Sequence, residues 1–123
     1  MAFKYLVDVV LQIIKKLTIN NIIHIIYMNW IISKSNIHGI GVFSKVNVKP
    51  NEYIDVAIGS DKLVTVFGSK INHSWSPTAQ LIYNSVNKTY DVHSIKNIDV
   101  GGEITLDYTF TPPFIKGPQP HWN

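Results

Sequence analysis

From residue 30 onward the sequence is a series of short runs of β-branched and aromatic residues, separated by residues that favour turns. The runs are WIIS, GVFS, EYIDVAI, KLVTVF, QLIY, TYDVHSI and EITLDYTF, and no helical period persists across them. Glycine, proline, asparagine and aspartate occupy the junctions, where tight turns are expected. The stretch QLIYNSVNKTYDV reads as a β-hairpin. The pattern therefore predicts a mostly β domain, either barrel-like or built from folded sheets.

A second regularity is a weak internal repeat at an offset of fifty residues. Identical or similar residues recur in the pairs Val42 and Val92, Ser44 and Ser94, Asn47 and Asn97, Val48 and Ile98, and Ile54 and Ile104. Each copy reads as a strand, a turn and a strand. Short β units resemble one another by chance, so the repeat alone is weak evidence.

The N-terminal region has a different character. Apolar residues recur with a helical period at Leu6, Val9, Val10, Ile13, Ile14 and Leu17. This spacing predicts an amphipathic helix that packs on the domain or on a partner. A helix lying on a membrane surface is the alternative, but its polar face carries only Lys4, Lys15 and Lys16 against Asp8, few charges for that role.

The uncharged stretch 17–33 contains too many polar side chains for a bilayer-spanning helix, and it predicts an extended, β-prone segment. We interpret residues 1–27 as an N-terminal extension, with Met28 as an alternative start, and residues 28–123 as one domain.

Composition excludes several classes of function. The 123 residues include no cysteine, which rules out disulfides, zinc–thiolate sites and thiol catalysis. It also fits a soluble protein in a reducing, intracellular setting. The formal charge is +3, of which residues 1–27 carry +2 (three lysines, one acid) and residues 28–123 only +1 (eight lysines, seven acids). We therefore expect no direct binding of nucleic acid.

Three polar segments stand out along the chain: SNIHGIGVFS (35–44), INHSWSPTA (71–79) and GGEITLDY (101–108). Gly39 and Gly41 form a Gly-x-Gly that permits a tight turn, but a dinucleotide fingerprint needs a third glycine and a following helix. His73 and Ser74 are neighbours that point to opposite faces of an extended chain, which argues against a base–nucleophile pair. Taken singly, each segment reads as an ordinary turn or strand.

In this order and spacing, the three segments resemble the SET-domain protein lysine methyltransferases. The likeness covers roughly residues 30–110, and the ending TPPFIKGPQPHW is similar to that of very short microbial and viral members. The resemblance implies a β-clip-like fold of small curved sheets with a knot-like C-terminal crossing. It also implies transfer of a methyl group from S-adenosyl-L-methionine to a lysine of a protein or peptide substrate, without a metal. A homodimer is compatible with it.

Site residues follow from the resemblance position by position. Tyr108 would be the catalytic tyrosine, with its hydroxyl beside the transferred methyl group. The implied cofactor-binding residues are Ile37, His38, Gly39, Ile40, Gly41, Asn72 and His73. Of these, the loop residues 37–41 and His73 would contact the cofactor largely through their backbone atoms. The structural alternatives are turn glycines and buried polar groups that satisfy the backbone at a chain crossing.

Three aromatic residues near the C-terminus, Phe110, Phe114 and Trp122, are candidates for a lysine channel or an adenine cover, or else belong to the core. The other histidines, His24, His93 and His121, show no ligand pattern and are assigned no role.

The sequence departs from the family pattern at Trp75, where a cysteine is common, and at Thr78, where an asparagine is common. Gly102 replaces the first acid of the usual Gly-Glu-Glu. Leu106 replaces an aromatic residue that influences how many methyl groups are added, so the number stays open. The helical insert that usually precedes the Asn-His-Ser segment is absent. These departures support an alternative: a weakly active or inactive SET-like module that binds peptide or cofactor.

Overall fold

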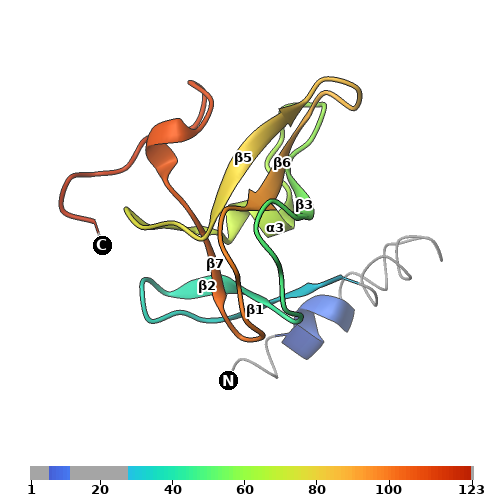
Figure 1. Ribbon diagram of the computed structural model, residues 1–123, viewed down its shortest axis with the longest axis vertical. Coiled ribbons are helices and arrows are strands. Elements are labelled where there is room, and N and C mark those ends of the chain that lie inside the picture. The colour runs from blue at the N-terminus through green and yellow to red at the C-terminus, as the bar shows by residue number, and fades with distance from the viewer. Residues whose placement is uncertain (1–5, 12–27, 123) are drawn as a thin grey trace.

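The computed structural model describes residues 6–11 and 28–122. Residues 6–11 are helical and lie at the same end of the molecule as strands β1 and β2 (Figure 1). They are the described part of the predicted N-terminal helix. The rest of that helix, and most of the extended segment predicted over 17–33, lie outside the described residues.

Two small sheets make up the described fold, so the prediction of a mostly β domain is confirmed (Figure 1). The four-stranded sheet has the order β1 (Trp30–Lys34), β2 (Ile40–Ser44), β7 (Glu103–Leu106) and β4 (Asn72–His73). The three-stranded sheet has the order β3 (Tyr53–Ile58), β6 (Thr89–Ser94) and β5 (Ala79–Asn84). The predicted hairpin is the antiparallel pair β5–β6, in register from Ala79 opposite Ser94 to Asn84 opposite Thr89.

Two predicted strands are wrong in whole or in part. The run KLVTVF forms only a single bridge to β3 and then a short helix, α3 (Val66–Ser69). Thr65 causes the change, because its side chain accepts a hydrogen bond from the Gly68 N–H and caps the helix. The run EITLDYTF stops at Leu106, where Asp107 caps the 3-10 helix η1 (Tyr108–Phe110) by accepting the Thr109 N–H.

The weak repeat corresponds to two copies of one backbone arrangement. Val48 and Ile98 exchange both of their backbone hydrogen bonds, at 2.8 and 2.9 Å. Two further backbone bonds recur in both copies. The Ser44 N–H donates to the Gly102 carbonyl, as the Ser94 N–H does to the Glu52 carbonyl. The Gly101 N–H donates to the Ser44 carbonyl, as the Asn51 N–H does to the Ser94 carbonyl. These reciprocal bonds join the two sheets, which buries the side chains of Val42 and Val92 completely.

The strand β7 positions the functional segments. It pairs antiparallel with β2 and parallel with β4, so that Asn72 lies opposite Thr105 and His73 opposite Leu106. The side chains of Ile71 and Ile104 are buried in the core below this junction. After η1, the tail 111–122 runs along the side of the molecule that is at the left in Figure 1. The knot-like crossing implied by the resemblance stays a prediction.

Candidate functional site

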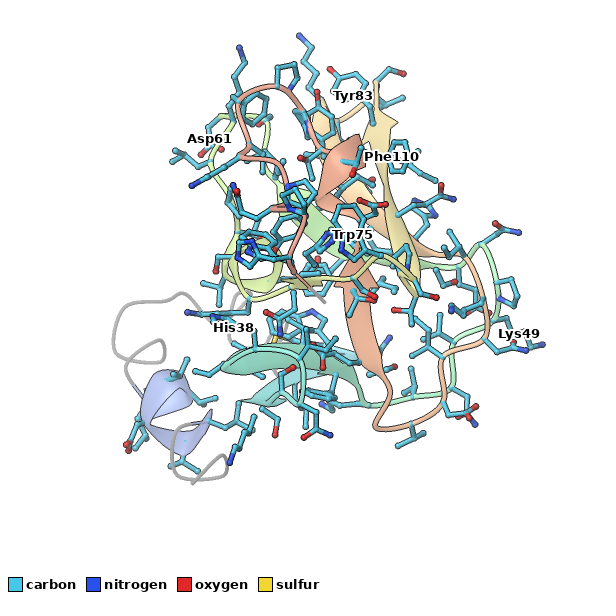
Figure 2. All side chains as sticks on the ribbon, turned by 90° about the vertical axis from the view of Figure 1, so that its left-hand side faces the viewer. His38, Lys49, Asp61, Trp75, Tyr83 and Phe110 are labelled. Carbon is cyan, nitrogen blue, oxygen red and sulfur yellow. The ribbon has the colours of Figure 1, made fainter. Side chains whose placement is uncertain are left out.

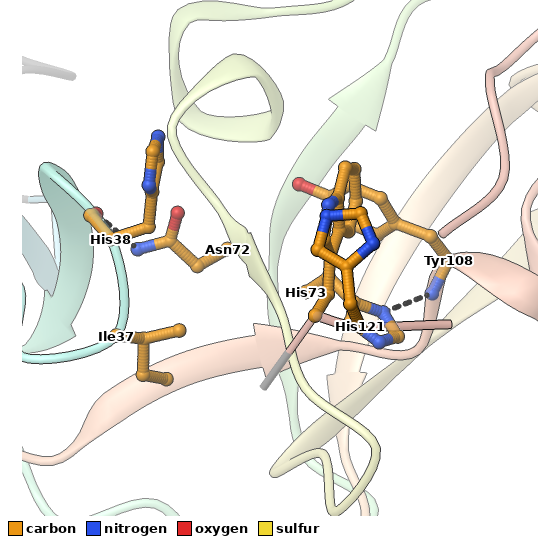
Figure 3. Close-up of a pocket in the computed structure, with 7 residues that line it drawn as sticks. Ile37, His38, Asn72, His73, Tyr108 and His121 are labelled. Carbon is orange, nitrogen blue, oxygen red and sulfur yellow. Dashed lines mark hydrogen bonds between the residues drawn. The ribbon is translucent and has the colours of Figure 1, made fainter. Parts of the chain in front are cut away.

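One cavity of about 330 Å³ collects residues from all three polar segments and from the tail. Its lining consists of Ile37, His38, Asn72, His73, Tyr108, His121 and Trp122 (Figure 3). Its volume lies in the range of roughly 300–1,000 Å³ that is usual for small-molecule pockets. Segments more than thirty residues apart thus meet at one concave site, because β4 and β7 are neighbours in the sheet.

The loop between β1 and β2 contributes only two of its predicted residues to the cavity wall. Ser35 organises the turn: its Oγ accepts the Ile37 N–H at 2.9 Å, and its own N–H donates to the Gly39 carbonyl at 2.9 Å. Gly39 has a φ of +45°, which a residue with a side chain adopts only with strain. Ile37 and His38 line the cavity, whereas Gly39, Ile40 and Gly41 do not.

Asn72 holds that loop in place. Its amide nitrogen donates to the carbonyl oxygens of His38 and Ile40, both at 3.1 Å, and to Oε2 of Glu103 at 3.0 Å. In Figure 3 the nitrogen faces the His38 carbonyl and the oxygen points away from it. Among the described residues, none donates a hydrogen bond to that oxygen. Asn72 therefore offers the cavity an acceptor while its nitrogen has a structural role.

Gly41 lies behind the cavity, against the same hydrogen bonds. A Cβ at this position would lie 2.6 Å from Oε2 of Glu103 and 3.1 Å from Nδ2 of Asn72. The absence of a side chain at Gly41 thus serves the contact between these two side chains. The predicted role of Gly41 in leaving room for a cofactor stays a prediction.

Glu103 is a residue of the site that sequence reasoning did not single out. Its carboxylate accepts from Oγ of Ser35 at 2.8 and 3.0 Å as well as from Asn72. One carboxylate on β7 therefore binds side chains from the other two polar segments. The sequence signal for Glu103 was that it retains the second acid of the family's Gly-Glu-Glu. That motif does not indicate which side chains the acid binds.

His73 and Tyr108 are neighbours in the cavity wall, with ring centroids 5.3 Å apart. The Tyr108 N–H donates to Nδ1 of His73 at 3.0 Å (Figure 3), so Nδ1 is unprotonated and the neutral ring carries its hydrogen on Nε2. That Nε2 is buried and has no hydrogen-bond partner among the described residues. Asp107 lies 3.9 Å from Nδ1 but caps η1 instead of pairing with the imidazole.

The Tyr108 hydroxyl donates a hydrogen bond to the carbonyl of Ile71. Burial of the side chain raises the pKa of this hydroxyl above its ordinary value near 10. The hydroxyl is therefore neutral at physiological pH. Since its hydrogen is directed at Ile71, its lone pairs remain free to accept contacts from a ligand.

The three C-terminal aromatic candidates have different places. Trp122 lines the cavity, with its ring centroid 5.8 Å from that of His73 and 6.0 Å from that of Tyr108. Phe110 lines a second cavity, and Phe114 contacts Tyr90 and lines neither. His121, which was assigned no role, also belongs to the first wall.

A second cavity of about 380 Å³ flanks the same turn after β7. It is lined by Pro77, Ala79, Gln80, Leu81, Ile95, Leu106, Asp107 and Phe110. Leu106, Asp107 and Phe110 thus belong to this cavity and Tyr108 to the first. The turn from Leu106 to Phe110 therefore contributes to the walls of both.

Thr78, one of the departures from the family pattern, still anchors its segment to β7. Its Oγ1 donates to the Glu103 carbonyl at 2.9 Å and accepts the Thr105 N–H at 3.0 Å. Its own N–H donates to Oγ1 of Thr105 at 3.0 Å. The hydroxyl therefore keeps a polar attachment at this position.

Within residues 6–11 and 28–122, no group of three histidine or acidic side chains is placed to hold a metal ion. In the same part of the chain, no helix has the length and apolar character needed to cross a membrane.

Neither a protein-family model nor a curated protein matches this chain. A solved structure does: a Plasmodium falciparum protein described as a "putative histone methyltransferase" is similar with a TM-score of 0.56 and 26% sequence identity. The match covers 68% of this chain and 95% of that one. The mostly β fold of small sheets is therefore similar to that of a protein described as a methyltransferase.

Proposed function

We propose that this chain has a SET-like fold and is an S-adenosylmethionine-dependent protein-lysine N-methyltransferase. The observation that carries the proposal is the meeting of Asn72, His73 and Tyr108 in one cavity, as the resemblance requires. The similarity to the Plasmodium falciparum structure supports the same class of reaction.

The residues of the first cavity suit this cofactor. Asn72 presents an amide oxygen that accepts no hydrogen bond from the described residues, which fits a donor such as an amino group. Tyr108, Trp122 and Ile37 supply aromatic and apolar surface, which fits a nucleoside base. His73 adds an imidazole ring to the same wall. When bound, S-adenosylmethionine supplies a methyl group already activated on a sulfonium.

The role of Tyr108 is electrostatic. Its neutral hydroxyl keeps its lone pairs available because its hydrogen is bonded to the Ile71 carbonyl. Such an oxygen accepts weak C–H···O contacts from a polarised methyl group and so orients it. Orientation of the two reacting groups is a large part of the catalysis available to a transfer of this kind.

The second cavity is the proposed entry for the lysine. Leu106 and Phe110 give it an apolar wall next to the Tyr108 turn. A lysine amine has an ordinary pKa of about 10.4 and must lose its proton before it attacks a methyl group. Apolar surroundings disfavour the ammonium form and so promote the neutral amine. The proposed substrate is therefore a protein or peptide that presents a lysine to this cavity.

The test has two stages on the full chain. Calorimetry with S-adenosylmethionine measures binding, and transfer of labelled methyl from the cofactor to core histones and to a mixed protein pool measures activity. Tyr108→Phe is expected to retain cofactor binding within a few-fold and to lose most methyl transfer. Transfer that is unchanged in Tyr108→Phe contradicts the assigned role. Binding without any transfer by the wild-type chain favours the alternative of an inactive SET-like binding module.

A further inference from the structure

Trp75 makes a contact that the proposed chemistry leaves unexplained. The residue is 47% exposed. Its Nε1–H donates a hydrogen bond of 2.7 Å to the backbone carbonyl of Trp122. Its ring lies edge-on against His73, with centroids 4.3 Å apart and an interplanar angle of 84°. Trp75 lies on the face that carries the C-terminal tail (Figure 2).

The end of the tail has few other attachments. Within residues 112–122, the backbone bonds are internal: Ile115 N–H to the Pro112 carbonyl and Trp122 N–H to the Gln119 carbonyl. Ile115 packs against the core. Beyond it, the Trp75 indole supplies the hydrogen bond that joins the described tail to the rest of the protein.

The tail end matters because it is part of the cavity. His121 and Trp122 line the first cavity, with Trp122 packed on His73 and Tyr108. Trp75 does not line this cavity, so any effect on a bound ligand has to pass through the tail. A small side chain at position 75 would have no donor that reaches the Trp122 carbonyl.

We propose that Trp75 is a positioning residue that fixes the C-terminal tail, so that Trp122 and His121 close one side of the cavity. The identity of the ligand rests on the proposed function, but the anchoring of the tail does not. The residue that departs most from the family pattern within its segment thus supplies the attachment that completes the site.

The first test needs no ligand. Trypsin cuts after Lys116, in the tail, and releases the peptide 117–123, which mass spectrometry identifies. Trp75→Phe keeps an aromatic ring at this position and removes the N–H donor together with part of the indole ring. It is expected to release this peptide about 3- to 10-fold faster, the factor that one hydrogen bond is worth. The control is Tyr53→Phe, a change at an exposed ring outside both cavities, which is expected to release the peptide at the wild-type rate. Equal release by wild type and Trp75→Phe overturns the proposal.

The second test measures the coupling between Trp75 and Trp122 at the cavity. Trp75→Phe and Trp122→Ala are each expected to raise the Kd for S-adenosylmethionine about 3- to 10-fold, with Trp75→Phe turning over normally at saturating cofactor. Because part of the Trp75 effect passes through the Trp122 side chain, the double variant is expected to lose less affinity than the sum of the two single losses. Fully additive effects, or a Trp75→Phe effect confined to Tm, contradict the proposal. If the wild-type chain does not bind the cofactor, the proposed function fails, and the trypsin experiment still decides whether Trp75 anchors the tail.

Discussion

The backbone N–H of Tyr108 donates a hydrogen bond to Nδ1 of His73 at 3.0 Å, across 35 residues of sequence. This bond links the segment after β7 to the strand β4 beside it, and it selects the His73 tautomer with its hydrogen on Nε2. The position of the proposed catalytic tyrosine thus depends on the side chain of His73. The resemblance had implied that His73 acts mainly through its backbone.

Removal of this acceptor is expected to destabilise the fold. His73→Ala leaves the Tyr108 N–H without its partner, at a cost of about 1–3 kcal/mol in the free energy of unfolding, before the loss of ring packing. His73→Asn places an amide oxygen near the position of Nδ1 and is expected to lose less. Urea unfolding of the three proteins measures the difference. Equal stability of His73→Ala and His73→Asn would show that the hydrogen bond contributes nothing.

The glycines of the loop are expected to differ in the reason for their sensitivity. Gly41→Ala places a Cβ 2.6 Å from Glu103 Oε2 and should disturb the Asn72–Glu103 contact, lowering both stability and ligand affinity. Gly39→Ala meets no atom within 4 Å but strains a φ of +45°, at a cost of roughly 1–2 kcal/mol in stability. Gly117→Ala is the control, since it meets no atom within 4 Å and has no positive φ. Thermal unfolding and cofactor titration separate these effects, and a Gly41→Ala protein that behaves like Gly117→Ala contradicts the prediction.

Glu103→Gln is expected to weaken the hydrogen bonds between the three polar segments. The substitution keeps the shape but replaces one accepting oxygen with an NH₂ group, which then faces either Ser35 Oγ or the Asn72 amide nitrogen. The loss is expected at about 1–3 kcal/mol of unfolding free energy, with weaker cofactor binding because Asn72 is less well fixed. Glu52→Gln, a change at an exposed glutamate outside both cavities, is the control. The prediction fails if chemical denaturation gives the same midpoint for both variants.

Alkaline pH is expected to destabilise the protein partly through Tyr108. Burial raises the pKa of its hydroxyl in the folded state, so the folded state holds this proton more tightly than the unfolded state. This contribution is fully present below the unfolded pKa of about 10 and is lost as the pH rises from there through the folded pKa. Burial, followed by the charges of Asp55 and Asp91, raises the pKa of Tyr53 in the same direction.

Tyr108→Phe is therefore expected to flatten the fall in stability above pH 10, as measured by unfolding at a series of pH values. Tyr83→Phe, at a half-exposed ring outside both cavities, serves as the control and should leave that fall unchanged. An alkaline profile of Tyr108→Phe that overlays the wild-type profile would contradict the assignment.

The sequence by itself determined the local features of this protein. The β-branched runs and their turn residues specified a mostly β chain and the β5–β6 hairpin, because strand and turn preferences act over a few residues. The strand predicted for KLVTVF is wrong because the side chain of Thr65 caps a helix there. A pattern of β-branched residues does not reveal this hydrogen bond between side chain and backbone. The residues of the cavity could be proposed only through a resemblance, motif by motif.

Only the tertiary structure decided which of these motifs meet and which hydrogen bonds join them. The bond from Ser35 to Glu103 spans 68 residues, and that from Trp75 to Trp122 spans 47, so neither leaves a periodic trace in the sequence. The first exists because β7 lies between β2 and β4, and the second because the tail after η1 passes beside the segment that follows β4. A contact of this kind depends on the path of the whole backbone, whereas a strand or a turn depends on its own few residues.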